Sequence, residues 1–507
     1  MDLNAVQSTS SRTGIEKFDA ALGGGFPAGS VVLLAGSSGS GKTIFVFQWL
    51  FEGVKNKENG MYLSMTEPLF KSIKNIEKMD FYDKSAIEQE KIKIVDLRDI
   101  YPNEEIIALS PDKLIEYIEK EVKRTNVKRV CIDSITAIAY TIDNRAKIRK
   151  FIFELGKKLS VLGCTAILTS EIIDPGKFSA YGVEEFIADV ILRLDQVKEQ
   201  DTLERKMLLT KVRGRAYKAE DIYFKISNKG IIVFPNLKGT LTYPSLGKRV
   251  STGNAQLDEM LSGGIFQGST TLLTGASGTG KTIACLQFIF EGLKRGETCL
   301  FAGFEESAEQ LLQNAKTFGW NLKEYIEKER LFLRCLYPHE KSVEEHLADI
   351  KELVENKKVT RCAVDSLTAL SNVFSKEKSS SMSRRLSAYL KARKITTVFT
   401  CGTASFVGGG ELTGTHISTL TDNTILMRYV EIESRLGWVI AVIKVRGSPH
   451  SRAIKSYEVT NKGIVLGKTL EGYEGVITGI SRKIFGNNNH DNNHNNNHDN
   501  NRKKTGF

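Results

Sequence analysis

Short apolar runs alternate with longer amphipathic segments along most of the chain. In its first part, apolar and β-branched residues form runs that predict strands at 31–36, 61–65, 92–97, 129–133 and 164–170. Helical patterns lie between these runs, near 42–55, 68–79, 111–125 and 145–162. Strands that are apolar throughout need cover on both faces, so the pattern predicts an α/β fold with a mainly parallel sheet flanked by helices. Beyond residue 188, an antiparallel extension is predicted from the runs at 189–196, 206–214, 221–226 and 231–234.

The same pattern occurs twice. Residues 13–53 align with residues 252–292 without a gap, and 21 of the 41 positions are identical. Further matches follow downstream, VCIDSITAIA with CAVDSLTALS and KVRG with KVRG. A repeat of this length indicates duplicated domains rather than a solenoid. We place the domains at 13–240 and 250–475, joined by a linker. Two segments are predicted to be disordered, 1–12 and the Asn/His-rich tail 476–507, because the tail offers no apolar surface to bury.

Composition narrows the class of protein. With 41% hydrophobic and 26% charged residues among 507, the chain is typical of a soluble globular protein. Its apolar runs are too short to span a membrane and its N-terminus is not a secretory signal. The seven cysteines form no CxxC pair, which favours reduced thiols and a cytoplasmic protein. The net charge of +11 includes the basic tail, so it is weak evidence for nucleic acid, which is not expected as a partner.

Both domains carry the pattern of a phosphate-binding loop. Residues 36–43 read GSSGSGKT and residues 275–282 read GASGTGKT, each between a predicted strand and a predicted helix. In such loops backbone N–H groups converge on phosphates, the lysine neutralises β and γ oxygens, and the next hydroxyl holds Mg²⁺. Two copies in the correct context favour ATP and Mg²⁺ as cofactors over plain glycine turns. The expected binding residues are Gly39, Ser40, Gly41, Lys42 and Thr43, and Ser277, Gly278, Thr279, Gly280, Lys281 and Thr282.

An aspartate ends a hydrophobic strand in each domain. Asp133 and Asp365 are both followed by serine. An acid at this position can bind Mg²⁺ beside the phosphate loop, directly or through water. It can equally cap the next turn. The phosphate loop upstream favours the magnesium role.

Acidic residues also follow the second strand of the second domain. Glu305 and Glu306 are expected beside the mouth of the phosphate loop, where a carboxylate can take a proton from water or a hydroxyl. Alternatively, both simply complement the helix dipole. The first domain has Thr66 and Glu67 in the same place. If the first acid is the base, that domain hydrolyses ATP slowly or uses Glu67.

Together these features resemble the KaiC family, double-domain ATPases that form the cyanobacterial clock oscillator. The resemblance covers the chain except its tail and is most specific at 413–433. It implies two tandem RecA-like P-loop NTPase domains in a homohexamer of two stacked rings, with ATP at every subunit interface. It also implies that the second domain is a serine/threonine autokinase and autophosphatase. The phosphorylated residues would be Ser418 and Thr419, with Thr413 as an auxiliary threonine.

The resemblance assigns further roles. Glu305 would be the base that activates the hydroxyl, and it is counted with the magnesium-holding residues. Ser448 and His450 would contact the nucleotide. Cations from the neighbouring subunit would meet the γ-phosphate, and by position these are Lys211, Arg213, Lys444 and Arg446. Without the resemblance, a lysine and an arginine two residues apart on a strand more often form one solvated face.

Alternatives and departures remain. Thr66 replaces the glutamate that the family has there, and Trp438 replaces a basic residue near the adenine and could stack on it instead. The tail shares nothing with the family's partner-binding tail, so a KaiA-like partner is unsupported, whereas KaiB-like or signalling proteins stay open. A second hypothesis is a RecA- or Rad-type DNA-binding ATPase with a DNA loop at 406–412, although that loop lacks interleaved aromatic and basic residues. A third is a scaffold that binds ATP and hydrolyses little of it.

Overall fold

The computed structural model describes most of both domains. It covers 10–65, 68–100, 111–142, 144–172, 182, 184–199, 202–217, 220–234, 237, 247–403, 421–432, 434–477 and 482–483. With Glu344–Ala348 left aside, the chain divides at Leu237 into two compact units, and each is described separately below. None of the helices among these residues is long and apolar enough to cross a bilayer. All seven cysteines carry free thiols.

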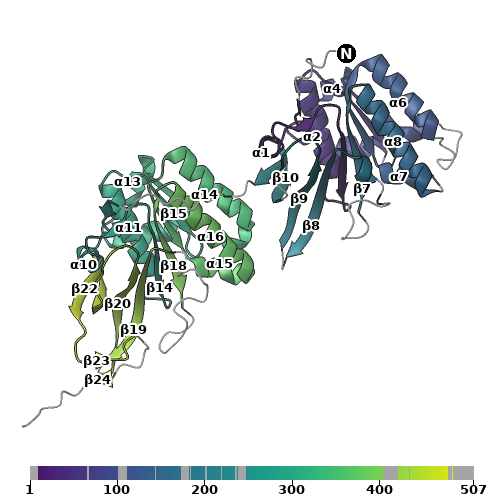
Figure 1. The fold of residues 1–507 in the computed structure, drawn as a ribbon. Coiled ribbons are helices and arrows are strands. Elements are labelled where there is room, and N and C mark those ends of the chain that lie inside the picture. The colour runs from purple at the N-terminus through teal and green to yellow at the C-terminus, as the bar shows by residue number, and fades with distance from the viewer. Residues whose placement is uncertain are drawn as a thin grey trace, which may run out of the picture. The chain divides into compact units, whose positions relative to one another are not determined.

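The first domain is built on a sheet that has nine strands among the described residues (Figure 1). In spatial order they are β11 (Gly230–Phe234), β10 (Asp221–Ser227), β9 (Thr202–Val212), β8 (Val190–Glu199), β3 (Val31–Gly36), β7 (Thr165–Glu171), β6 (Val127–Asp133), β4 (Asn59–Ser64) and β5 (Ile92–Asp96). From β8 to β5 all neighbours are parallel, and from β8 to β11 they are antiparallel. The central strand β3 leads into the first phosphate loop. The predicted parallel sheet with an antiparallel extension is confirmed.

Helices cover both faces of this sheet. Apolar side chains of α2 (Lys42–Lys55) pack on one face, and those of α6 (Pro111–Thr125) and α8 (Arg145–Val161) pack on the other. Successive residues of β6 point into the two different clusters, as expected for a strand buried on both sides. The shorter elements are β1 (Ser10–Ser11), α1 (Glu16–Ala21), β2 (Phe26–Pro27), α3 (Leu69–Ile76), α4 (Lys84–Glu88), α5 (Leu97–Ile100), α7 (Ile135–Tyr140) and α9 (Glu184–Ile187).

The second domain repeats this architecture. Its described sheet runs in the order β16 (Leu331–Cys335), β15 (Cys299–Gly303), β17 (Arg361–Asp365), β18 (Thr396–Gly402), β14 (Thr270–Gly275), β19 (Asn423–Ile432), β20 (Arg435–Val445), β21 (Ile454–Thr460) and β22 (Gly463–Thr469). The strands from β16 to β19 are parallel, and those from β19 to β22 are antiparallel. The central strand β14 again precedes the phosphate loop. As in the first domain, the parallel strands lie together on one side of the sheet and the antiparallel strands lie on the other.

Most of the remaining elements of the second domain have a counterpart in the first domain, whereas β23 and β24 have none among the described residues. Helix α11 (Lys281–Lys294) follows β14 as α2 follows β3. The other helices are α10 (Ala255–Met260), α12 (Ala308–Thr317), α13 (Leu322–Glu327), the 3₁₀ helix η2 (Pro338–Glu340), α14 (Val343–Lys357), α15 (Leu367–Val373) and α16 (Lys376–Ala392). The two-residue strands are β12 (Arg249–Val250), β13 (Ile265–Phe266), β23 (Tyr473–Glu474) and β24 (Arg482–Lys483).

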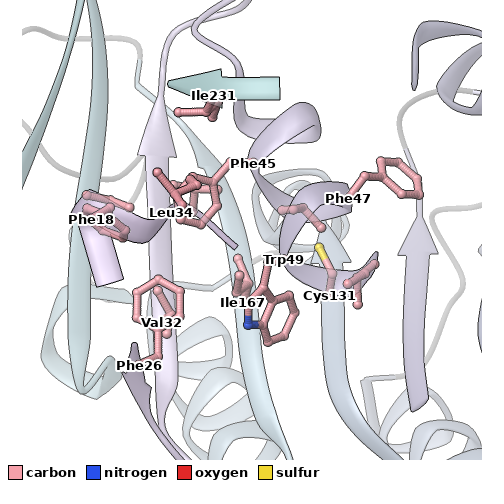
Figure 2. Close-up of a cluster of buried hydrophobic side chains, with 14 of the residues drawn as sticks. Phe18, Phe26, Val32, Leu34, Phe45, Phe47, Trp49, Cys131, Ile167 and Ile231 are labelled. Carbon is pink, nitrogen blue, oxygen red and sulfur yellow. The ribbon is translucent and has the colours of Figure 1, made fainter. Parts of the chain in front are cut away.

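The cores of the two domains differ where α2 and α11 meet their sheets. In the first domain three phenylalanines meet there, with Phe18 lying 5.8 Å from Phe45 and 6.2 Å from Phe26 between ring centroids (Figure 2). The aligned residues of the second domain are Leu257, Ile265 and Ala284. These smaller side chains line a cavity of about 40 Å³. The second core is therefore less completely filled.

A buried arginine also recurs in both domains. Arg129 on β6 pairs with Glu58, with 2.6 Å between Nη2 and Oε2. Arg361 on β17 pairs in the same way with Glu297 at 2.6 Å. Each guanidinium also donates to backbone carbonyls of the helix after the phosphate loop and of the segment that begins the domain. Both charges are therefore buried with their hydrogen bonds satisfied.

Candidate nucleotide and metal sites

Each phosphate loop ends in a glycine that starts a helix. Gly41, with a φ of 104°, precedes α2, and Gly280, with a φ of 85°, precedes α11. This left-handed conformation favours glycine. Neither helix has a side-chain cap or an acidic residue in its first turn. The backbone N–H groups and the positive end of each helix dipole therefore point to where an anion can bind.

The loop lysines lie inside their own loops. Lys281 Nζ donates to the carbonyl oxygens of Gly275 and Ala276, both at 2.8 Å. Lys42 Nζ donates to Gly36 O at 2.8 Å and Ser37 O at 3.0 Å. Burial lowers the pKa of both lysines, and nearby carboxylates oppose this effect. A phosphate oxygen can replace these neutral acceptors with a charged one, which makes a stronger hydrogen bond.

The antiparallel strands of the second domain support its phosphate loop. Tyr457 OH on β21 donates to the carbonyl oxygen of Thr279 at 2.6 Å. A Cβ added to Gly278 would lie 2.5 Å from the hydroxyl oxygen of Tyr429, so only glycine fits there. Trp438 stacks on Tyr457 with ring centroids 6.0 Å apart. Tyr457 therefore holds the loop by a hydrogen bond, and Trp438 packs on the ring of Tyr457.

Among the acids of the second domain, Asp365 is held by two hydroxyls. Thr282 Oγ1 donates to Asp365 Oδ2 at 2.6 Å, and Thr400 donates to Oδ1. Burial raises the pKa of Asp365, and these two hydrogen bonds oppose the rise. The structure thus brings together two predicted magnesium-holding residues, Thr282 and Asp365. Their role in holding Mg²⁺ stays a prediction.

The paired glutamates have different surroundings. Ser366, the residue after the strand-end aspartate, donates to Glu305 Oε1. Asn314 Nδ2 donates to Glu306 Oε2 at 3.0 Å. Burial raises the pKa of Glu306, and the Asp365 carboxylate raises it further. Glu305 is thus hydrogen-bonded to the residue that follows Asp365, and its role as the base stays a prediction.

In the first domain the strand-end acid has different partners. Thr169 Oγ1 donates to Asp133 Oδ1 and Tyr62 OH donates to Asp133 Oδ2, both at 2.6 Å. Burial raises the pKa of Tyr62, and so does the Asp133 carboxylate, so the hydroxyl keeps its proton. Thr66 and Glu67 lie outside the described residues. Their catalytic roles stay predictions.

The KVRG segments lie at the opposite end of each sheet from the phosphate loop. Arg213 Nη1 donates to Asp189 Oδ1 at 3.2 Å, and Asp189 Oδ2 accepts from the backbone N of Val31, the first residue of β3. The phosphate loop follows the last residue of that six-residue strand. At about 3.3 Å per residue, the two ends of β3 are about 17 Å apart. Arg213 is therefore not placed to meet the phosphate loop of its own domain.

The second KVRG segment has the same placement. Asp422 accepts from the backbone N of Thr270, which begins β14, and Arg446 Nη1 lies 4.0 Å from Asp422 Oδ1. The lysines are held nearby, with Lys211 donating to Glu185 O at 3.0 Å and Lys444 donating to the carbonyl oxygen of Thr421 at 2.7 Å. The arginine side chains are more than half exposed.

The other candidate residues are placed as follows. Ser448 accepts from Arg249 and donates to Pro449 O at 3.0 Å, so its hydroxyl has partners within its own domain. His450 is half-buried on the same loop. Thr279 donates to Ala276 O at 2.8 Å, which fixes the shape of the loop. Ser40 is buried, while Gly39, Ser277 and Gly278 are exposed. The loop 406–412 and residues Thr413, Ser418 and Thr419 lie outside the described residues.

Sequence reasoning missed several residues of these sites. Thr169 and Thr400 hold the strand-end aspartates, and their signal was a threonine at the same place in two aligned apolar strands. Tyr457 had no comparable signal, because its contact depends on the pairing of β20 with β21. Tyr62 differs from its aligned residue Phe301 by a hydroxyl, and only the structure shows what that hydroxyl contacts.

The comparisons with known proteins agree with this geometry. The family model described as "ATPase: KaiC" matches residues 11–238 and again residues 250–471. The chain belongs to the KaiC family. Circadian clock protein KaiC3 of Synechocystis sp. is 35% identical over 471 residues, which cover 92% of this chain and 93% of that protein. Circadian clock oscillator protein KaiC of Parathermosynechococcus lividus is 36% identical over 479 residues (93% and 88%), and that of Synechococcus elongatus is 34% identical over 476 residues (93% and 92%).

Membership in the KaiC family confirms the predicted tandem RecA-like domains and the ATPase class. The residues present fit Mg·ATP: an uncapped helix start, a lysine inside the loop, and a threonine hydrogen-bonded to an aspartate. No cluster of three or more His, Cys, Asp or Glu side chains that could hold a metal occurs in the described part of the chain. Mg²⁺ is usually bound by one or two protein groups together with substrate phosphates, and Thr282 with Asp365 would supply the protein groups.

Proposed function

We propose that the chain is an ATP-hydrolysing ring protein whose second domain phosphorylates its own Ser418 and Thr419 and so acts as a switch or timer. The observation that carries the proposal is the position of Arg213 and Arg446. Each lies at the far end of its sheet from the phosphate loop of its own domain, which supports a role for it at the nucleotide of another copy. The family resemblance supports a homohexamer of two stacked rings.

The surface around Arg213 supports contact with a second copy. A hollow of about 610 Å³ lies there, lined by three further cationic side chains of α8. Phe153 and Phe186 also line it, with 56% and 64% of their surfaces exposed. Exposed phenyl rings are costly in water, and cations beside them can receive a nucleotide's phosphates. A neighbouring phosphate loop with bound ATP would satisfy both.

The chemistry in the second domain follows from its residues. A hydroxyl oxygen attacks the γ-phosphorus, the bond to the bridging β–γ oxygen breaks, and ADP leaves with that electron pair. The hydroxyl proton passes to Glu305, which Ser366 orients. Lys281 and the neighbour's Arg446 stabilise the charge on the transferring group, a contribution of roughly 10³–10⁵ in rate for an arginine. Thr282 and Asp365 would hold Mg²⁺, which neutralises phosphate charge.

The first domain is proposed to hydrolyse ATP slowly, with Glu67 as its only acid at that place. Partners are proposed to be KaiB-like or signalling proteins, and the compartment to be the cytoplasm. Binding of nucleic acid is not proposed, because no observation favours it.

Phosphorylation is tested by mass spectrometry. After the full chain is incubated with Mg·ATP, the peptide that contains Ser418 and Thr419 should gain about 80 Da, the mass of one added HPO₃ group. Glu305→Gln should slow this gain, whereas Glu309→Gln, an exposed glutamate on α12, should not. If the peptide never gains mass, the autokinase proposal is wrong. Equal labelling of Glu305→Gln and the unaltered chain would remove Glu305 from the mechanism.

The contribution of a neighbouring copy is tested by mixing two inactive variants. Lys281→Ala lacks a working phosphate loop, and Arg446→Ala lacks the cation for the next copy. When the two variants are mixed in equal amounts and form rings, about one interface in four combines an intact loop with an intact arginine. Phosphorylation by the second domain should therefore return in part. Mixing Arg446→Ala with the double variant Lys281→Ala/Arg446→Ala should restore nothing. Activity of Arg446→Ala alone equal to that of the unaltered chain would contradict the proposal.

A further inference from the structure

The strand-end aspartates of the two domains accept their second hydrogen bond from different donors. Asp365 Oδ2 accepts from Thr282 Oγ1 of the phosphate loop at 2.6 Å. Asp133 Oδ2 accepts instead from Tyr62 OH, also at 2.6 Å. The other carboxylate oxygen has the same kind of partner in both domains, a threonine of the adjacent strand. The domains thus differ at one carboxylate oxygen.

The difference can be traced to one position in the sheet. Tyr62 on β4 is opposite Cys131 on β6, and Phe301 on β15 is opposite Ala363 on β17. Both rings are almost fully buried, with 1% of their surface exposed. In each domain the residue opposite the ring lies two positions before the aspartate. The tyrosine therefore brings a hydroxyl to the aspartate where the phenylalanine brings none.

This hydroxyl bears on how the phosphate loop holds a cation. When the Thr282 hydroxyl donates a hydrogen bond to Asp365, the lone pairs of its oxygen remain for a metal ion. In the first domain Tyr62 already donates to the corresponding oxygen, Asp133 Oδ2, so Thr43 would have to share that oxygen with a second donor.

We propose that Tyr62 is a positioning residue that weakens divalent-metal binding at the first phosphate loop by occupying Asp133 Oδ2. The second loop, with Phe301 in the same place, binds the metal more tightly. The inference rests on the proposed function, in which both loops bind Mg·ATP. Under this proposal, the hydroxyl of Tyr62 makes the affinity for the divalent metal differ between the first and the second domain. A purely structural tyrosine, whose buried hydroxyl only needs an acceptor, would leave metal affinity unchanged when replaced by phenylalanine.

The test measures metal binding directly in the full chain. In a Lys281→Ala background, which silences the second loop, Mn²⁺ is titrated in the presence of a non-hydrolysable ATP analogue, and free Mn²⁺ is followed by electron paramagnetic resonance. Tyr62→Phe should lower the Mn²⁺ midpoint about tenfold, whereas removal of an outer-shell partner that supports a metal ligand usually weakens metal binding by roughly 10–100-fold. A raised midpoint would therefore overturn the proposal. Tyr82→Phe, which removes a hydroxyl from a tyrosine packed on Phe51, is the matched control and should leave the midpoint unchanged.

The reciprocal variant tests the same claim without removing a contact. In a Lys42→Ala background, Phe301→Tyr should raise the Mn²⁺ midpoint of the second loop about tenfold. If Tyr62→Phe does not fold, this variant decides alone. A midpoint that stays the same or moves the other way in a folded variant overturns the role of Tyr62 and leaves the ATPase proposal intact. If the unaltered chain shows no metal-dependent nucleotide binding, the proposed function fails and this inference fails with it.

Discussion

Removing the phenyl ring of Phe45 should destabilise the first domain selectively. The ring is fully buried and lies 5.8 Å from Phe18 and 6.2 Å from Phe26 between centroids. Phe→Ala substitutions in cores cost about 3–5 kcal/mol, and aromatic pairs add about 0.5–1.5 kcal/mol beyond the buried area. We therefore expect Phe45→Ala to lower the free energy of unfolding of the first domain by about 4 kcal/mol.

The aligned position of the second domain predicts a change of opposite sign. Ala284 lines a cavity of about 40 Å³. At about 24 cal/mol per Å³ of cavity, filling it is worth at most about 1 kcal/mol, less the small helix cost of a β-branched residue. Ala284→Val should thus raise the free energy of unfolding of the second domain by less than about 1 kcal/mol.

Urea unfolding followed by tryptophan fluorescence can separate the domains. Of the three tryptophans, Trp49 is in the first domain and Trp320 and Trp438 are in the second. With the last two replaced by phenylalanine, Trp49 reports the first domain alone. Phe70→Ala is the control, because its ring is 67% exposed and its loss should cost less than about 0.5 kcal/mol. A loss below about 1.5 kcal/mol for Phe45→Ala would refute the packing argument.

Two further predictions concern stability. Gly292→Ala should destabilise the second domain by at least about 2 kcal/mol, because the added Cβ would lie 2.6 Å from Nε of the buried Arg361. With Trp49 replaced by phenylalanine, Trp320 and Trp438 report urea unfolding of the second domain, and a midpoint that did not move would contradict this prediction. Asp96→Asn should lose stability at neutral pH, because hydrogen bonds from Arg98 hold the pKa of the Asp96 carboxyl below its usual value. Because the pKa of Asp96 is lower in the folded state, its ionised carboxylate stabilises the folded state fully above the unfolded pKa of about 3.9. This stabilisation is lost as the pH falls through the folded-state pKa. The difference between variant and unaltered chain should therefore shrink below about pH 4, and a constant difference would contradict it.

Much of the fold could be predicted from the sequence because the buried strands are short, apolar and regularly spaced. The structure places α2 at Lys42–Lys55 and α6 at Pro111–Thr125, as predicted, and the sheet has its antiparallel extension after residue 188. The phosphate loops followed from residue spacing, because their chemistry needs glycine, lysine and threonine in a fixed order. The extent of each domain stays a prediction.

The rest of the site depended on contacts between strands that spacing does not reveal. Thr282 donates to Asp365 across 83 positions of sequence, and Tyr62 donates to Asp133 across 71. The opposite-end position of Arg213 and Arg446 needed the strand order, since only parallel pairing shows which ends of β3 and β8 coincide. The roles of Glu305, Ser418 and Thr419 came from the family resemblance, and biochemistry has to test them.

The buried arginines Arg129 and Arg361 bear on how the two domains arose. In each half a guanidinium passes a helix glycine, Gly53 or Gly292, that has no room for a methyl group, and it meets an acid and two carbonyls beyond it. An arrangement that needs so many simultaneous matches is not expected to arise twice. It must have existed in a single-domain precursor before the gene doubled. The differences between the halves, including Tyr62 against Phe301 and Phe45 against Ala284, then record how two initially identical copies diverged.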